Sequence, residues 1–391
     1  MSDTFCILPW IHIYANADGS VIPCCIAHHH MHMGNVQTNT IEEIWNNDAY
    51  KSLRRAMLEG ERSPTCRACY NQEELGVESL RQSINGEFEH LIPLKDTTNE
   101  DGSLDNIDLK YLDVRWSNIC NFKCRSCSST FSSSWAKEEN KDNVYILAGG
   151  ESNDNLYEQF EPHFASIEKF YFAGGEPLLT DKHYDILNHL INIGKTDVKI
   201  RYNTNLSVLS YKNQSVIELW KHFEDVQIAA SLDSWGSRAE YIREGTVWKE
   251  IEQNILSIRK HVPHVNLDLN CVSSVFNVMT MTDFFDYILD NNLFDIHKVQ
   301  PTIYNIQNPN YYRYTVLNDK LKQKAIQKLS SKSYSDKIDV KLKETISTLE
   351  NTEYSPNDLK EFVNTTKKYD TLRNRDFSKT FPELNEIWSN C

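Results

Sequence analysis

The chain has 391 residues, of which 40% are hydrophobic and 25% are charged. This length predicts two or more domains with sizeable cores. The net charge of −14 argues against nucleic acid or an anionic membrane as the main partner. No run of about 18 apolar residues occurs, and the N-terminus lacks the basic segment of a signal peptide. We therefore expect a cytoplasmic protein without a membrane span.

The ten cysteines are clustered along the chain. Five occur before residue 70 and three between residues 120 and 127, whereas Cys271 and Cys391 are isolated. Without an export signal, their close spacings favour metal binding over a disulfide framework. Cys271 lies in a strand-like run and is expected to be a buried core residue.

The first 95 residues are predicted to form an α+β module. Residues 11–24 predict a hairpin that turns at Asp18-Gly19. Residues 40–60 predict one amphipathic helix, with Thr40 and Glu43 as a capping box and Gly60 as the stop. The polar, turn-rich residues 96–107 are predicted to be a linker.

Residues 108–305 are predicted to form an α/β domain, because strand-like runs alternate there with segments of helical period. The runs are 109–117, 167–175, 198–205, 226–233, 265–274 and 297–303. Such a sheet is either doubly wound or part of a barrel, and in both cases functional groups gather at the C-terminal ends of the strands. Residues 306–391 predict a helical extension.

A cysteine-rich loop follows the first of these strands directly. Cys120, Cys124 and Cys127 have the spacing Cys-x3-Cys-x2-Cys. Three thiolates on one tight loop can hold three irons of a cubane cluster and leave the fourth iron open. A zinc site with a further ligand or a water molecule is the alternative.

This triad and four later motifs resemble the radical S-adenosylmethionine (radical SAM) superfamily. The motifs are Ala-Gly-Gly-Glu-Pro at 173–177, Asn-Thr-Asn at 203–205, Ser-Leu-Asp at 231–233 and Tyr-Ile-Arg-Glu-Gly at 241–245. The resemblance implies a partial (β/α)6 TIM-like radical SAM barrel over 108–305. It also implies a 4Fe–4S cluster on the three cysteines and S-adenosylmethionine bound at the open iron.

The same resemblance implies which residues contact S-adenosylmethionine. The loop with Glu176 would hold the methionine amino group, the end of the third strand would contact the ribose and methionine, and the end of the fourth would contact the ribose. Arg243 would bind the carboxylate. The full set is Gly174, Gly175, Glu176, Pro177, Asn203, Asn205, Ser231, Asp233 and Arg243. Ser126 stands where the superfamily often has an aromatic residue, and no catalytic acid or base is identified.

The N-terminal cysteines resemble the auxiliary-cluster modules called SPASM and twitch. Gly19 lies between Cys6 and Cys24, and Cys66-x2-Cys69 follows. Four cysteines imply a twitch-like module over 1–95 with one auxiliary 4Fe–4S cluster, and zinc is the alternative. The module precedes the barrel, which inverts the familiar order. A hairpin at Gly19 would return Cys24 toward Cys6, and an extended segment would point Cys25 the other way.

Residues 27–33 contain four histidines and two methionines, which are ligand types for copper or zinc. We expect a solvated or substrate-facing loop here. A histidine that tunes the nearby cluster is a third interpretation. Whether His28–His32, Cys25 or Cys391 has a metal or substrate role stays open.

Taken together, the resemblance implies a radical SAM enzyme that takes an electron from a ferredoxin or flavodoxin-type donor. A 5′-deoxyadenosyl radical would abstract hydrogen from a peptide or protein substrate, with net oxidation or cross-linking aided by the auxiliary cluster. A small-molecule radical SAM dehydrogenase is one alternative. A non-catalytic zinc or iron–sulfur interaction protein is another, and an electron-transfer protein is a third.

Overall fold

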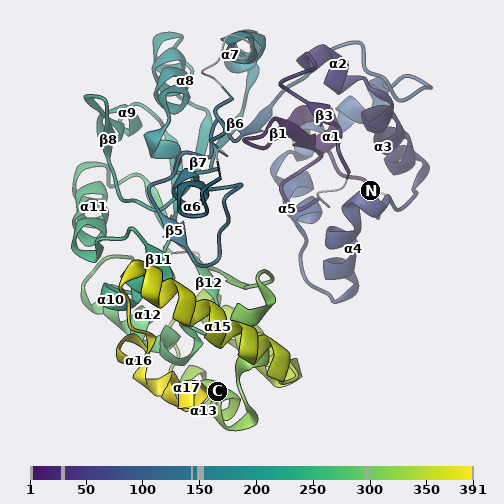
Figure 1. Cartoon of the computed structure of the whole chain (residues 1–391). Coiled ribbons are helices and arrows are strands. Elements are labelled where there is room, and N and C mark those ends of the chain that lie inside the picture. Colours follow the sequence, from purple (N-terminus) through teal and green to yellow (C-terminus); the bar gives the residue numbers. More distant parts are fainter. Residues whose placement is uncertain are drawn as a thin grey trace. The chain divides into compact units, whose positions relative to one another are not determined.

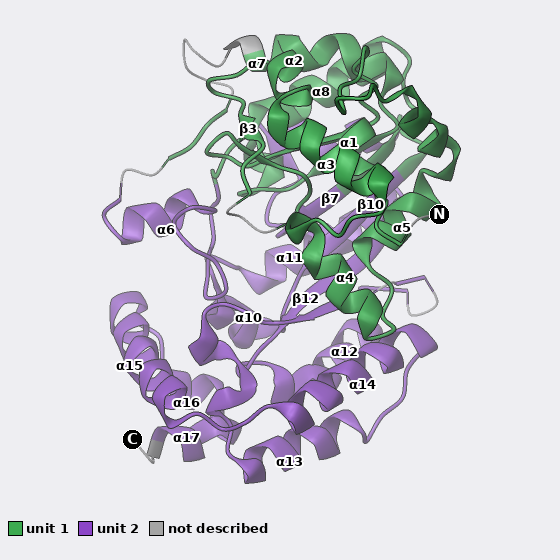
Figure 2. Cartoon of the chain, turned by 90° about the vertical axis from the view of Figure 1, so that its right-hand side faces the viewer, with its two compact units in different colours: residues 1–119, 142–201, 222–225 green, residues 120–141, 202–221, 226–391 purple. Residues whose placement is uncertain are grey.

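The computed structural model describes residues 3–27, 31–141, 144–147, 154–295, 298–299 and 301–389. The chain divides into two units, which Figure 2 shows in different colours. Unit 1 comprises residues 1–119, 142–201 and 222–225, and unit 2 comprises residues 120–141, 202–221 and 226–391.

A sheet that joins the N-terminal hairpin to parallel strands forms the centre of unit 1 (Figure 1). Its order is β6 (Lys169–Phe172), β4 (Tyr111–Val114), β1 (His12–Ala15), β2 (Ser20–Ile22) and β3 (Gly34–Asn35). β4 is parallel to both β6 and β1, whereas β2 is antiparallel to β1 and β3. The cysteine-bearing N-terminus is therefore built onto the same sheet as the strand that leads to the cysteine triad.

The predicted hairpin between residues 11 and 24 is confirmed. The Gly19 N–H donates to the Asn16 carbonyl at 2.8 Å, and Gly19 has a φ of 81°. A Cβ at this position would approach Cγ of Gln37 to 2.7 Å, so both the space and the left-handed backbone require glycine.

Residues 40–60 form two helices, whereas the sequence predicted one. They are α2 (Ile41–Trp45) and α3 (Asp48–Glu59). The break occurs because the Asn47 side chain accepts a backbone N–H of the first turn of α3 and caps it. The capping box of Thr40 and Glu43 is present, and Gly60 ends α3 in the left-handed conformation, as predicted.

The segment 96–107, predicted to be a linker, packs on α3. The Gly102 carbonyl accepts from Nη1 of Arg54 at 3.3 Å, and Lys51 pairs with Asp101 at 2.7 Å. A Cβ on Gly102 would lie 2.9 Å from the Lys51 carbonyl carbon. The predicted domain boundaries stay a prediction.

The sheet of unit 2 contains the later strands of the α/β region. Its order is β13 (Thr302–Asn305), β12 (Asn266–Ser273), β10 (Asp225–Ser231) and β7 (Lys199–Thr204), of which β7 and β10 begin in unit 1. β10, β12 and β13 are parallel. Helices follow these strands, as in α11 (Trp248–His261) and α12 (Met281–Asp290). The predicted α/β fold is confirmed, and Cys271 is buried in β12 as expected.

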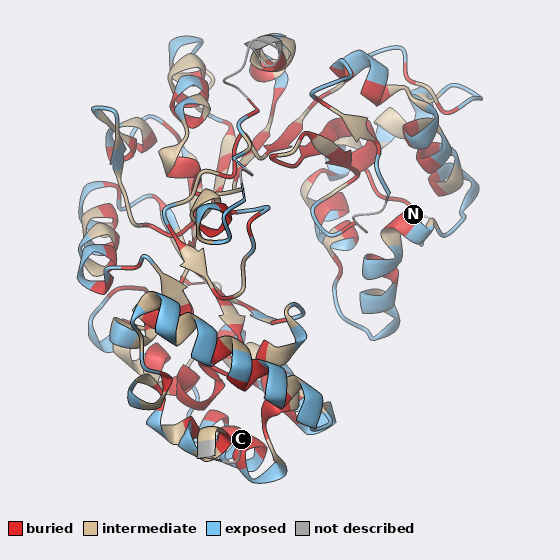
Figure 3. Cartoon of the chain, in the orientation of Figure 1, coloured by how far each residue is buried: buried red, intermediate tan, exposed pale blue. Residues whose placement is uncertain are grey.

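The C-terminal extension is mostly helical, as its sequence period predicts. Its helices are α13 (Asp319–Leu329), α14 (Asp336–Asn351), α15 (Pro356–Arg373), α16 (Phe377–Thr380) and α17 (Asn385–Ser389). Figure 3 shows that α15 buries one face and exposes the other. On the buried face, the Phe362 ring lies 5.7 Å from that of Phe276. None of the described helices combines the length and hydropathy that a membrane crossing requires.

Candidate functional site

Serine side chains shape the loop that carries Cys120, Cys124 and Cys127. The Ser134 hydroxyl donates to the Cys120 carbonyl at 2.7 Å, and the Cys120 N–H donates to Oγ of Ser133 at 3.2 Å. None of the three cysteines is in a disulfide, and all three are partly exposed. Accessible sulfurs on one fixed loop fit the three-cysteine side of a cubane cluster.

Arg243 contacts the middle cysteine of this loop. The short strands β5 (Lys123–Cys124) and β11 (Arg243–Glu244) pair antiparallel and place Arg243 opposite Cys124. Nη1 of Arg243 donates to Sγ of Cys124 at 3.7 Å. Burial raises the pKa of the Cys124 thiol, and the adjacent guanidinium opposes that shift.

Asp233 fixes the orientation of Arg243. Its carboxylate accepts from Nε and Nη2 at 2.8 and 2.9 Å, and it is 3% exposed. One of its oxygens also accepts the N–H of Val272 at 2.8 Å. The sequence assigned Arg243 to the carboxylate of the cofactor and Asp233 to its ribose. The structure shows instead that these two residues form an ion pair with each other.

Asn205 connects the end of β7 to the cysteine loop. Its Nδ2 donates to Oδ1 of Asn121 at 3.1 Å, and its Oδ1 accepts the Ser207 N–H at 2.8 Å. Asn203 is half-buried near the end of β7, and Ser231 is half-buried as the last residue of β10. Unit 2 therefore brings Asn205, Asp233 and Arg243 into one set of contacts with the triad loop.

The Gly-Gly-Glu-Pro motif lies in unit 1 against the backbone just before Cys120. The Gly175 N–H donates to the Ser117 carbonyl at 3.1 Å, and the Glu176 N–H donates to the Ile119 carbonyl at 2.7 Å. A Cβ on Gly175 would lie 2.6 Å from the Asn118 carbonyl carbon. The glycine is thus required by the close approach of two loops at the end of β4 and β6.

The other three residues of this motif are also placed by local contacts. A Cβ on Gly174 would meet the Ser117 carbonyl oxygen at 3.0 Å. The Glu176 carboxylate accepts the Leu178 N–H at 3.1 Å, and Pro177 begins a short 3-10 helix. Glu176 is only 1% exposed. The roles assigned to these residues in cofactor binding stay predictions.

Helix α15 holds the cysteine loop through Asp370, a contact that the sequence did not reveal. The Asp370 carboxylate accepts from Nη2 of Arg125 at 3.2 Å and from the Tyr241 hydroxyl at 2.6 Å. The Arg125 guanidinium lies 4.1 Å from the centre of the Tyr241 ring. Arg125 lies between Cys124 and Cys127, so α15 fixes the loop from its buried side.

Arg373 makes a second contact from α15 to the same loop. Its Nη1 donates to the Lys123 carbonyl at 3.2 Å, and its Nη2 pairs with Glu138 at 2.7 Å. The guanidinium also lies 4.7 Å from the centre of the Trp135 ring, whose Nε1 donates to the Cys124 carbonyl at 2.8 Å. The C-terminal extension is therefore part of the architecture of the site.

The four remaining candidate ligands come together in unit 1. One cavity is lined by Cys6, Cys24, Cys66 and Cys69, together with Arg81, and Cys25 is not among its lining residues. The pKa of Cys6 is raised to about 12, chiefly by burial and in smaller part by the neighbouring Cys66 and Cys69. Buried thiols that oppose each other's ionisation fit a cationic cluster, which would stabilise all four thiolates.

Helix α5 (Leu80–Glu87) fixes the chain around Cys6. Asn85 donates from Nδ2 to the Phe5 carbonyl at 2.9 Å and accepts the Ile7 N–H at 2.9 Å. Arg81 donates to the same Phe5 carbonyl at 2.8 Å. The segment around Cys6, the first cysteine of the set, is therefore held by a helix that follows Cys69, the last cysteine of the set.

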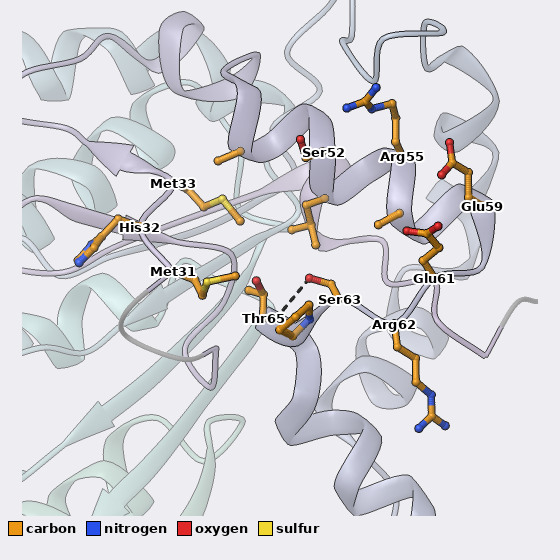
Figure 4. A pocket seen from close by; sticks show the side chains of 14 residues that line it. Met31, His32, Met33, Ser52, Arg55, Glu59, Glu61, Arg62, Ser63 and Thr65 are labelled. Atoms are coloured by element: carbon orange, nitrogen blue, oxygen red, sulfur yellow. Dashed lines mark hydrogen bonds between the residues drawn. The ribbon is translucent and has the colours of Figure 1, made fainter.

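A second cavity of unit 1, of about 700 Å³, adjoins the four-cysteine cavity through the shared wall residue Thr65. Figure 4 shows Met31 and Met33 pointing into it and His32 pointing away. In the ranges that the structure describes, no three His, Cys, Asp or Glu side chains are arranged to hold a single metal ion. His28–His30 and Cys391 lie outside the described residues.

Sequence comparison identifies both cysteine-bearing regions. Residues 114–281 match the model of the radical SAM superfamily, and residues 6–70 match SPASM, an iron–sulfur cluster-binding domain. The chain therefore contains a radical SAM domain. The SPASM match lies N-terminal to the radical SAM domain, as predicted, and contains all four cysteines of the cavity. These two domains imply 4Fe–4S clusters and S-adenosylmethionine as cofactors of this radical SAM enzyme.

Two solved structures are distantly similar to this radical SAM protein. SuiB of Streptococcus suis bound to S-adenosylmethionine gives a TM-score of 0.39 at 15% identity, covering 81% of this chain and 64% of SuiB. TYW1 with a lysine-pyruvate adduct bound gives 0.29 at 13% identity, covering 60% of this chain and 70% of TYW1. The chain thus spans less than two thirds of the SuiB chain. No curated protein matches it.

Proposed function

We propose that this radical SAM enzyme abstracts hydrogen from a peptide or protein substrate and catalyses a net oxidation or cross-link. When bound, the three-cysteine cluster and S-adenosylmethionine supply a 5′-deoxyadenosyl radical by reductive cleavage of the sulfonium. The observation that carries the proposal is the second set of thiols, Cys6, Cys24, Cys66 and Cys69, around one cavity of unit 1. Four ligands leave no iron open for a substrate, so such a cluster is suited to electron transfer.

The residues of the triad loop are proposed to bind and orient, while the cofactor supplies the radical chemistry. Cys120, Cys124 and Cys127 would hold the cluster. Arg243 would place a positive charge beside the Cys124 sulfur, at the 3.7 Å that separates Nη1 from Sγ. Asp233 would keep the guanidinium in that position.

The proposed reaction removes two hydrogen atoms from the substrate. One is transferred to the 5′ carbon and leaves as 5′-deoxyadenosine. The other leaves as a proton and an electron, and we assign acceptance of this electron to the four-cysteine site. A ferredoxin or flavodoxin-type protein is the proposed donor of the electron that starts each turnover.

Mass spectrometry tests this function directly. The anaerobically reconstituted full-length protein is incubated with S-adenosylmethionine, a reductant and candidate peptides encoded beside its gene. We expect 5′-deoxyadenosine together with a peptide that has lost two hydrogens. Cys127→Ala should abolish both products, and Cys25→Ala serves as the matched control. Oxidation of a small molecule with no change in any peptide would favour the small-molecule alternative.

A further inference from the structure

A polar cavity of about 470 Å³ lies at the C-terminal ends of β12 and β13 in unit 2. Ser273 ends β12 and Asn305 ends β13, and both line it. The other walls come from residues 306–307, 313–315, 348 and 352–355. All lining residues except Ser273 lie outside the two family matches, so neither match assigns this cavity a role.

A hydrogen-bond network holds the inner wall of the cavity in place. Oγ of Ser273 and the Tyr314 hydroxyl are 2.6 Å apart, and the Tyr314 hydroxyl donates to Oδ1 of Asn305 at 2.8 Å. Nδ2 of Asn305 donates to Oγ1 of Thr348 at 2.8 Å. Tyr314 is only 3% exposed. Because these groups satisfy one another, the wall is formed before any ligand arrives.

Contacts within unit 2 join this wall to the cysteine loop. The residue before Ser273 is Val272, whose N–H donates to Asp233 at 2.8 Å. Asp233 binds Arg243, which donates to Sγ of Cys124 at 3.7 Å. The cavity and the three-cysteine loop thus share one framework of contacts.

Two charged side chains of the wall have no partner of opposite charge among the described residues. Nε and Nη2 of Arg313 both donate to the Gln307 carbonyl, with Nε at 2.7 Å. Within the described ranges, Arg313 forms no ion pair. Glu353 makes neither a hydrogen bond nor an ion pair in the same part of the chain. A guanidinium with unused donors and a carboxylate therefore line one polar space.

We propose that this cavity binds a peptide segment that carries both a carboxylate and an ammonium group. Arg313 takes the carboxylate and Glu353 the ammonium, while hydroxyls such as that of Tyr354 serve the peptide amides. The volume lies within the roughly 300–1,000 Å³ of typical ligand pockets, and the polar lining selects a polar ligand. The claim that the bound peptide is the enzyme's substrate rests on the proposed function. The claim that the cavity binds such a peptide does not.

Calorimetric titration of the reconstituted, full-length holoprotein tests the site. The first probe is the capped tetrapeptide acetyl-Ala-Lys-Ala-Glu-amide, which carries both charges. Two further probes replace Glu by Gln or Lys by Gln, and maltotriose is a neutral ligand rich in hydroxyls. We expect the doubly charged peptide to bind with a Kd below about 10 mM and each singly charged peptide to bind about ten-fold more weakly.

Matched variants assign the two charges. Arg313→Gln should lower the affinity for the doubly charged peptide about ten-fold but leave the affinity for the peptide without Glu unchanged. Glu353→Gln should also lower the affinity for the doubly charged peptide about ten-fold, but leave the affinity for the peptide without Lys unchanged. Arg259→Gln changes a half-buried arginine that bonds to Asn292, and Glu350→Gln changes an exposed carboxylate. Both lie outside the cavity, so these controls should bind as the wild type does. Glu353 is exposed, so its variant tests the proposal even if Arg313→Gln fails to fold.

Binding of maltotriose in place of the peptides, or peptide binding that neither variant changes, would overturn the proposed site. Peptide binding that follows the predicted pattern, in a protein that forms no 5′-deoxyadenosine, would leave the site standing and reject the proposed function instead. The two failures are therefore distinguishable.

Discussion

Arg243 and Cys124 face each other across the β5–β11 pair, with Nη1 3.7 Å from Sγ, while Asp233 binds the other side of the same guanidinium. This arrangement makes Asp233 the residue that fixes a positive charge beside a cluster ligand. A charged, bidentate pair in a buried site is far more sensitive to the loss of one partner than a surface pair is.

Asp233→Asn should weaken the binding of S-adenosylmethionine about ten-fold, because Arg243 loses its anionic partner while the side chain keeps its size. Equilibrium dialysis with the labelled cofactor, under anaerobic conditions, measures the change. Asp225→Asn is the matched control, since it removes the carboxylate of another bidentate pair, with Arg201 at 2.7 and 2.8 Å. Unchanged binding by Asp233→Asn would contradict the assignment.

Removing the α15 contact should loosen the three-cysteine cluster without unfolding the chain. Arg373→Met keeps much of the packing against Trp135 and deletes the bonds to Glu138 and the Lys123 carbonyl. We expect chelators to extract iron from the variant several-fold faster. Arg238→Met, which removes another partly buried arginine pair, with Glu383 of the C-terminal region, should keep the wild-type rate. Equal extraction rates would count against a role for α15.

Gly175→Ala should lower the free energy of unfolding by about 1–3 kcal/mol, because the new methyl group would overlap the backbone at Asn118 and Ile119. Denaturant titration followed by circular dichroism measures the loss. Gly86→Ala is the matched control, since a Cβ there meets no atom within 4 Å and the site lies in helix α5. That substitution should be neutral or stabilise by up to about 1 kcal/mol. Similar destabilisation by both would contradict the steric argument.

Iron content distinguishes the two adjacent cysteines of the N-terminal region. Cys24 lines the four-cysteine cavity and Cys25 does not. The wild-type protein should carry about eight irons per chain, Cys24→Ala about four, and Cys25→Ala the wild-type number. Iron analysis after anaerobic purification gives the result. Loss of iron from Cys25→Ala but not from Cys24→Ala would reassign the ligand.

Local patterns made the sheet and the loops predictable, because strand-like runs alternate with helical periods and the motifs at 173–177, 203–205 and 231–233 lie at strand ends. The break at Asn47 escaped prediction, since its capping role competes with a continuous apolar stripe. The ion pair of Asp233 with Arg243 also escaped it, because each residue matched a separate motif.

The hold of α15 on the cysteine loop could not be read from the sequence either. Arg373 lies 250 residues from Lys123, and its segment has the charge pattern of an ordinary exposed helix. Only the folded chain shows that its guanidinium is buried against the site. The serine-rich residues 128–134 and Trp135 were the available signal, since such side chains commonly bond to nearby backbone.

Pulsed electron paramagnetic resonance with S-adenosylmethionine labelled with ¹⁵N at its amino group is the most direct test of whether Cys120, Cys124 and Cys127 leave an iron open to the cofactor. We predict a ¹⁵N hyperfine coupling to the reduced cluster in the wild type and in Cys24→Ala, and no coupling in Cys127→Ala. A reduced wild-type cluster without ¹⁵N coupling, in protein that has bound the labelled cofactor, would contradict an open iron at this loop.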